Sequence, residues 1–154
     1  MLSKSSQTLK KLPVKLAFVA LQLVPSYIGF DKEPMYAFDE KTIENLTYLC
    51  DLPFISFDGE EIYKSLEDKA AILFYHTIKN HLFENGNKRT AVILVLLFYI
   101  HNEKWLDIDE NKLYDLSLHV ASSESSRKEE VLNDIKTLFR QSETEKPKGI
   151  AETI

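Results

Sequence analysis

The residues best suited to chemistry lie in one short stretch, 81–90, which reads HLFENGNKRT. An imidazole can act as a base near neutral pH, so His81 could take a proton from an attacking hydroxyl. Gly86 lets the backbone come close to a ligand, and Asn87 can donate hydrogen bonds from its side-chain amide. The stretch therefore combines a candidate general base with a loop that could bind a ligand.

Two cations follow at once and indicate the charge of that ligand. Lys88 and Arg89 fall in the first turn of a predicted helix, where free N–H groups and the helix dipole favour anions and disfavour cations. A di- or triphosphate would offset both charges, and Arg89 could grip two phosphate oxygens. Phe83 is expected to turn inward and anchor the loop to the core.

Two helices must position this loop. The first is predicted from Ser65, with Asp68 completing a near capping box, to about Lys79. The second is predicted from Lys88 to about His101. Its apolar run, residues 91–100, is about half of what a membrane span needs and is typical of a helix buried on all sides.

The rest of the chain predicts an all-α bundle, with a loop at 51–59. Further helices are expected at 4–23, interrupted at or restarted from Pro13, and at 40–49, capped by Asp39. Two more are expected, one through Val120 capped by Asp109 and one through Arg140 capped by Ser125 or Ser126. The predicted organisation is an N-terminal helical segment at 1–25, the main domain at 26–140 and a disordered polar tail at 141–154.

Composition narrows the classes of partner and compartment. The chain has 154 residues and a net charge of -5, which fits one domain and gives no reason to expect nucleic acid or an anionic membrane as a partner. The single cysteine, Cys50, excludes an internal disulfide and favours a reducing compartment, so a cytoplasmic protein is expected.

The motif resembles the signature of the Fic/Doc (Fido) family, His-x-Phe-x-Asp/Glu-Gly/Ala-Asn-Gly/Lys-Arg, and the resemblance extends over about residues 26–140. It implies a helical Fido bundle with a short β-hairpin flap, and ATP or another nucleoside triphosphate as donor. It also implies His81 as the general base for a protein hydroxyl, Gly86, Asn87 and Lys88 as the phosphate cradle, and Arg89 as the residue that neutralises phosphate charge.

One departure from the signature concerns Mg²⁺. The family usually has an acid at the position of Asn85, where it holds the phosphate-bound ion, and here the carboxylate is one place earlier, at Glu84, which should face elsewhere. Three alternatives stay open: Asn85 binds the metal weakly, Glu84 reaches it, or the enzyme is weak or inactive.

A second departure concerns the reaction. Adenylylating Fic proteins often have Gly at the position of Lys88 and a second Arg at that of Val92. Lys88 is similar to Doc, a toxin that acts as a kinase on a translation factor, whereas Gly86 keeps adenylylation open. The resemblance favours Doc-like phosphorylation over adenylylation.

The resemblance also implies protein partners. A flap at 28–38 could pair with the target protein by β-augmentation, although an ordinary loop is an equal alternative there. No full inhibitory Ser/Thr-x-x-x-Glu-Gly/Asn motif is found, so the Doc comparison implies an antitoxin chain.

Two rival functions compete with the transferase. A HEPN-type ribonuclease needs a His within about six residues of its Arg, and 90–95 contain none. A degenerate Fido domain that serves as a binding module stays open because of Asn85. His76, His101 and His119 are expected to be surface or packing residues.

Overall fold

Helices carry most of the chain in the computed structural model, which describes residues 8–23 and 38–147. The predicted all-α fold is confirmed, with two short antiparallel strand pairs added. The α-helices are α1 (Val14–Leu23), α2 (Glu40–Asp51), α3 (Leu66–Lys79), α4 (Asn87–His101), α5 (Glu110–Ser122) and α6 (Lys128–Ser142). The strands are β1 (Ser56–Phe57), β2 (Glu60–Glu61), β3 (Lys104–Leu106) and β4 (Glu143–Glu145), and the 3-10 turns are η3 (Leu52–Phe54) and η4 (Ser125–Arg127).

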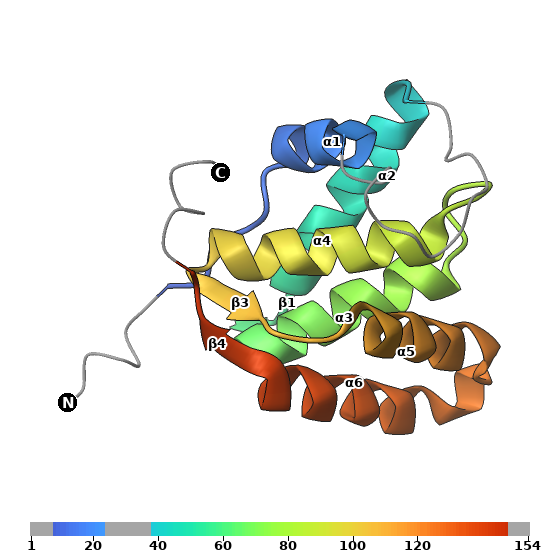
Figure 1. Ribbon diagram of the computed structural model, residues 1–154. Helices are drawn as coiled ribbons and strands as arrows, with labels where there is room; N and C mark the ends of the chain where they lie inside the picture. The colour runs from blue at the N-terminus through green and yellow to red at the C-terminus, as the bar shows by residue number, and fades with distance from the viewer. Residues whose placement is uncertain (1–7, 24–37, 148–154) are drawn as a thin grey trace.

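The central element is α4. Figure 1 shows it running through the middle of the bundle, with α1 and α2 on one side and α3, α5 and α6 on the other. Every residue of 91–100 except Leu96 is buried, as expected of a helix with apolar residues on all its faces. Across residues 8–23 and 38–147, no helix has the length and apolar content to cross a membrane.

Side-chain caps fix where three of the helices begin. Asp39 accepts a hydrogen bond from the Thr42 N–H at 3.1 Å and starts α2. Ser65 and Asp68 bond each other's backbone N–H groups in a complete capping box at the start of α3. Asp109 accepts from the Asn111 N–H at 3.1 Å and starts α5. These three predicted starts are confirmed.

Two other predicted helix starts are only partly right or wrong. The expected restart of the first helix at Pro13 is confirmed, since α1 begins at Val14, but residues 8–12, which were expected to be helical, are not. Before α6, Ser125 and Ser126 lie in η4, and neither serine caps the helix, which begins at Lys128. A serine followed by another serine and an arginine suits a tight 3-10 turn as well as a cap, and here the turn forms.

The expected loop at 51–59 is more regular than predicted. It contains η3 and most of a hairpin in which Ser56 pairs with Glu61 and Phe57 with Glu60. The two connecting residues, Asp58 and Gly59, have φ values of 56° and 81°, which is the turn that matches strand twist. The flap predicted at 28–38 lies outside the described residues except for Phe38.

One buried lysine connects this hairpin to α3. Lys69 is 1% exposed, and its Nζ donates to the Pro53 carbonyl at 3.1 Å. The same Nζ donates to the Tyr63 carbonyl, pairs with Glu61 and lies 4.5 Å from the centroid of the Phe54 ring. A buried charge is tolerated only with such partners, so Lys69 fixes η3 and β2 against the start of α3.

The disordered tail predicted at 141–154 is wrong for residues 141–145, which are in regular secondary structure. Residues 141 and 142 continue α6, and β4 follows and pairs with β3, Trp105 opposite Thr144 and Leu106 opposite Glu143. The pairing is invisible to local sequence reading because it joins residues about 40 positions apart. It closes the bundle at the C-terminal end of α4, opposite the motif loop (Figure 1). Residues 148–154 lie outside the described residues.

Glu143 makes the docking of β4 sensitive to pH. The Tyr99 hydroxyl donates to its Oε2 at 3.0 Å. Burial, and then the neighbouring Glu67 carboxylate, raise the pKa of Glu143 from 4.5 to about 7. Between these two pH values the folded state binds more protons than the unfolded state, so this group adds stability as pH falls from about 7 toward 4.5 and loses it as pH rises.

The Glu143→Gln variant is therefore expected to lose part of the pH dependence of stability. Compared with the wild type, it should be more stable at pH 8, and this advantage should shrink at pH 5, as measured by thermal unfolding at both pH values. Glu145→Gln is the control, because Glu145 lies in the same strand with an exposed side chain. Parallel pH profiles for wild type and Glu143→Gln would contradict the assignment.

Candidate functional site

The motif loop connects two well-defined helix ends. α3 ends at Lys79, with Asn80 as its C-cap, and α4 begins at Asn87 after Gly86, whose φ is 74°. Glycine adopts this left-handed backbone without a steric penalty, which explains its place at the turn into α4. His81 also has a positive φ, 48°, and turns the chain out of α3.

Hydrogen bonds fix the shape of the loop from inside. The Asn87 side chain bonds the backbone of Phe83 twice: its Oδ1 accepts from the Phe83 N–H at 3.2 Å and its Nδ2 donates to the Phe83 carbonyl at 2.8 Å. The Gly86 carbonyl accepts from both the N–H and the hydroxyl of Thr90, at 2.8 and 2.7 Å. The amide that was predicted to face phosphate therefore already holds the loop.

Two of the predicted site residues are directed into the protein. Phe83 is 5% exposed and belongs to the hydrophobic core, as expected of a loop anchor. Arg89 is also 5% exposed. Its position in the first turn of α4 agrees with the sequence, but its side chain is largely covered by protein.

The other predicted residues meet around one hollow of about 300 Å³. The structure brings the candidate base and the N-terminus of α4, with Lys88, to the same hollow. Phe83 and Arg89 do not line it. The lining residues are Ile78, His81, Glu84, Asn85, Gly86, Asn87, Lys88 and Ala121.

Sequence reasoning missed the contributions of α5 and α2 to this site, and that of Ile78 on α3. Ala121, near the end of α5, closes one wall of the hollow, and a lone alanine gives no signal in sequence. From α2, the Asn45 Nδ2 donates to the Leu82 carbonyl at 3.1 Å. On α3, Ile78 reads only as part of an apolar face.

The residues that line the hollow determine how a metal ion could be held there. Glu84 lines it together with Asn85, although Glu84 was expected to face elsewhere. Among the described residues, no group of three or more His, Cys, Asp or Glu side chains could hold a metal ion. One carboxylate and one amide oxygen fit Mg²⁺ held mainly by phosphate oxygens, and do not fit an all-protein metal centre.

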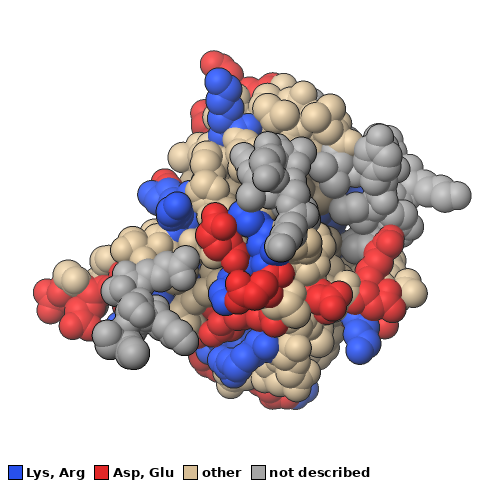
Figure 2. All heavy atoms as spheres, turned by 60° about the vertical axis from the view of Figure 1, so that its left-hand side comes forward, with Lys and Arg blue, Asp and Glu red and all other residues tan. Residues whose placement is uncertain are grey.

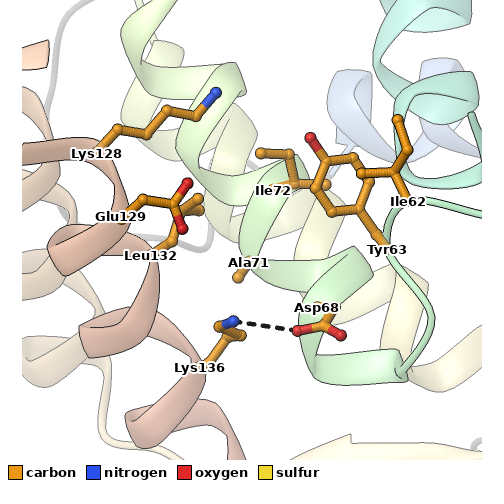
Figure 3. A pocket seen from close by; sticks show the side chains of 9 residues that line it. All are labelled: Ile62, Tyr63, Asp68, Ala71, Ile72, Lys128, Glu129, Leu132 and Lys136. Atoms are coloured by element: carbon orange, nitrogen blue, oxygen red, sulfur yellow. Dashed lines mark ion pairs between the residues drawn. The ribbon is translucent and has the colours of Figure 1, made fainter. Parts of the chain in front are cut away.

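A larger hollow, about 390 Å³, lies elsewhere, between α3, α6 and the segment before α3 (Figure 3). Both of its lysines have partners inside the chain: Lys136 pairs with Asp68 at 3.2 Å, and Lys128 lies 3.0 Å from the Nε2 of His76. Its apolar floor consists of Ile62, Ala71, Ile72 and Leu132. The start of α6 lines it, but its lysines are already paired within the chain and no histidine is among its lining residues, so the motif hollow is the better candidate.

Surface charge does not point to a different site. On the face drawn in Figure 2, acidic and basic side chains lie interspersed among other residues. This mixture agrees with a net charge of -5 spread over 19 basic and 24 acidic residues. Attraction of a phosphate group would therefore depend on the local charges of the motif hollow.

A comparison with models of protein families gives one match. Residues 26–99 match the model of the Fic/DOC family. The match supports a Fido domain in this chain, and the helical bundle is consistent with the Fido fold. Members of this family are generally transferases that act on proteins with nucleotides. No curated protein and no solved structure matches the chain.

Proposed function

We propose that this Fido domain is a Doc-like phosphotransferase that moves a phosphate from ATP or another nucleoside triphosphate to a Ser or Thr hydroxyl of a target protein. The observation that carries the proposal is the motif hollow of about 300 Å³, which His81 lines together with Lys88 and the N-terminus of α4. A base and an anion site in one hollow are what transfer from a phosphate to a hydroxyl requires.

In the proposed reaction, His81 acts on the target hydroxyl, and Lys88 and the start of α4 act on the phosphates. The imidazole of His81 takes the proton of the target hydroxyl as its oxygen attacks the γ-phosphorus. The bond between that phosphorus and the β–γ bridging oxygen breaks, and the diphosphate leaves with the charge. The N–H groups at the start of α4 and the ammonium of Lys88 stabilise that charge, and His81 releases its proton to solvent.

Two further side chains have proposed supporting roles. Glu84 and Asn85 would hold Mg²⁺ on the phosphates, where the ion supplies additional positive charge. The guanidinium of Arg89, one residue after Lys88, would add positive charge from the protein side of the first turn of α4. Asn87 acts mainly by holding the loop through Phe83.

The proposal also includes protein partners and a compartment. The target, for which a translation factor is the candidate, would dock as an extended strand on the 28–38 segment, and an antitoxin chain would restrain the activity. The chain has one partial match to the inhibitory motif, Ser126-x-x-x-Glu130, which is followed by Val131. It extends from η4 into the first turn of α6, where Glu130 pairs with Arg127. The cytoplasm is the proposed compartment.

Two alternatives have specific observations in their favour. Adenylylation is supported by Gly86, since Gly at this position is shared with adenylylating relatives. A Fido domain that only binds its partner is supported by Asn85, because the usual acid for the metal is missing. Each alternative predicts a result that differs from that of the phosphotransferase in the following experiment.

The test is incubation of the purified protein with cell extract and ATP labelled on either the γ or the α phosphate, with Mg²⁺ or Mn²⁺ present and any bound partner removed. Label transferred to protein from the γ position alone supports the phosphotransferase. Label from the α position supports adenylylation. Transfer of neither label supports the binding module and overturns the proposal.

A further inference from the structure

The backbone of His81 adopts an unusual conformation. Its φ of 48° lies in the left-handed region, which residues other than glycine adopt uncommonly. Such a conformation persists only when its surroundings hold it, and it is often found at functional sites. A conformation of this kind depends on the contacts that hold the residues on both sides of His81.

One contact holds the peptide that follows His81. The Nδ2 of Asn45, in the second turn of α2, donates to the carbonyl of Leu82 at 3.1 Å. The two residues are 37 positions apart in sequence, so this bond fastens the motif loop to a helix that is otherwise outside the motif. Asn45 does not line the motif hollow.

A second contact holds the residue that precedes His81. The Nδ2 of Asn80 donates to the hydroxyl of Tyr48 at 3.2 Å. Tyr48 lies three residues after Asn45, so both side chains project from one face of α2. This helix therefore contacts the chain immediately before and immediately after His81.

A chain of hydrogen bonds fixes the orientation of Asn80. The Nζ of Lys128 can only donate, so the Nε2 of His76, 3.0 Å away, must accept. The Nδ1 of His76 then carries the proton and donates to the Oδ1 of Asn80 at 3.0 Å. Burial lowers the pKa of His76, and the hydrogen bond to Asn80 opposes this shift only in part, which favours the neutral imidazole that this chain of bonds requires.

We propose that Asn45 and Tyr48 are positioning residues, which hold His81 in its left-handed conformation with the imidazole at the motif hollow. The expected effect on catalysis rests on the proposed function. The expected effect on the backbone conformation of His81 does not depend on that function. Tyr48 is 44% exposed, so its side chain contributes little to the core. This exposure argues against a purely structural role for Tyr48.

The variants are chosen to remove single hydrogen bonds. Asn45→Asp keeps the shape of the side chain but cannot donate to Leu82 when ionised, whereas Asn45→Gln retains a donor. Tyr48→Phe removes the hydroxyl that accepts from Asn80 and keeps the aromatic ring. This milder change provides a second test if Asn45→Asp does not fold. Thr47→Ala is the matched control, because its hydroxyl bonds only the Ile43 carbonyl of its own helix, at 2.8 Å.

The kinetic measurement is the rate of transfer of the γ phosphate of labelled ATP to proteins of a cell extract, as a function of ATP concentration. Asn45→Asp is expected to lower the maximal rate about tenfold or more and to leave the half-saturating ATP concentration within about twofold, since misplacement of a catalytic group affects the chemical step. Tyr48→Phe should show a smaller loss, Asn45→Gln partial recovery and Thr47→Ala the wild-type rate. A wild-type maximal rate in both Asn45→Asp and Tyr48→Phe would overturn the proposal.

The second measurement is the φ angle of His81 from NMR scalar couplings and carbon shifts in the full chain. The proposal expects φ to leave the left-handed region, or to average with other conformations, in Asn45→Asp. An unchanged φ overturns it, even if the transfer rate falls. If the wild type transfers no label, the proposed function fails, while the NMR result still decides whether α2 positions His81.

Discussion

Replacement of His81 by alanine is expected to lower the rate of transfer by about 10²-fold or more, because the reaction loses the group that takes the proton from the target hydroxyl. His81 is exposed at the edge of the motif hollow and does not belong to the hydrophobic core. Its removal should therefore change the thermal unfolding temperature little. The measurement is initial-rate transfer of labelled phosphate at saturating ATP, with circular dichroism to verify the fold.

His101→Ala is the matched control for this experiment. His101 is the last residue of α4, and fourteen residues at about 1.5 Å each separate it along the helix from the motif end of α4. Its variant should keep the wild-type rate. Equal losses in both variants, or a His81→Ala protein as active as the wild type, would contradict the role of His81 as general base.

The motif loop could be predicted from sequence because its chemistry is local. A base, a glycine and two cations within nine positions together indicate a loop that binds phosphate, and the capping pattern at Ser65 and Asp68 correctly placed the helix that leads into it. The apolar run at 91–100 predicted the helix that leaves it. These features depend on neighbours in sequence. The structure brings His81, Gly86 and Lys88 to one hollow, whereas the side chain of Arg89 is buried beside it.

The support of the loop could not be predicted, because it comes from distant elements. Nothing around Asn45 distinguishes it from an ordinary helical asparagine, and its bond to Leu82 follows only from the packing of α2 against the motif loop. The same reason explains the missed strand β4, whose partner β3 lies about 40 residues earlier. Long-range pairing is set by the packed core rather than by the local pattern.

The hairpin at β1 and β2 is a different kind of error, since a local signal is present. Asp58 and Gly59 form the dipeptide most typical of a two-residue hairpin loop. The alternation of Ile55 and Phe57 before it is short, and Pro53 favours a loop, so the strand pattern around the turn is weak. In the structure both turn residues have the positive φ values that this hairpin requires.

Asn87 shows how one residue type can support two interpretations. From sequence, its amide is expected to bind phosphate, as the family resemblance implies. In the structure, both ends of that amide bond the backbone of Phe83. The hydrogen bonds give Asn87 a structural role in shaping the loop, and they make Phe83 and Asn87 a single unit on which the geometry of the hollow depends.

Phe83→Ala is consequently expected to have the largest effect on stability of any change in the loop. The side chain is 5% exposed within the hydrophobic core, and truncation of a buried phenylalanine costs about 3–5 kcal/mol of unfolding free energy. The value should fall near the lower end of that range, since Phe83 lies in a loop at the edge of the core, where neighbours can relax into part of the cavity.

Phe57→Ala is the control with the same substitution and the opposite environment. Phe57 is 77% exposed in β1, so its truncation should change stability by no more than about 0.5 kcal/mol. Urea unfolding of both variants measures the difference. If Phe83 is the anchor that shapes the loop, its variant should also lose transfer activity under conditions in which circular dichroism still shows a folded helical bundle. A folded Phe83→Ala protein with wild-type transfer would show that the motif hollow does not depend on this anchor.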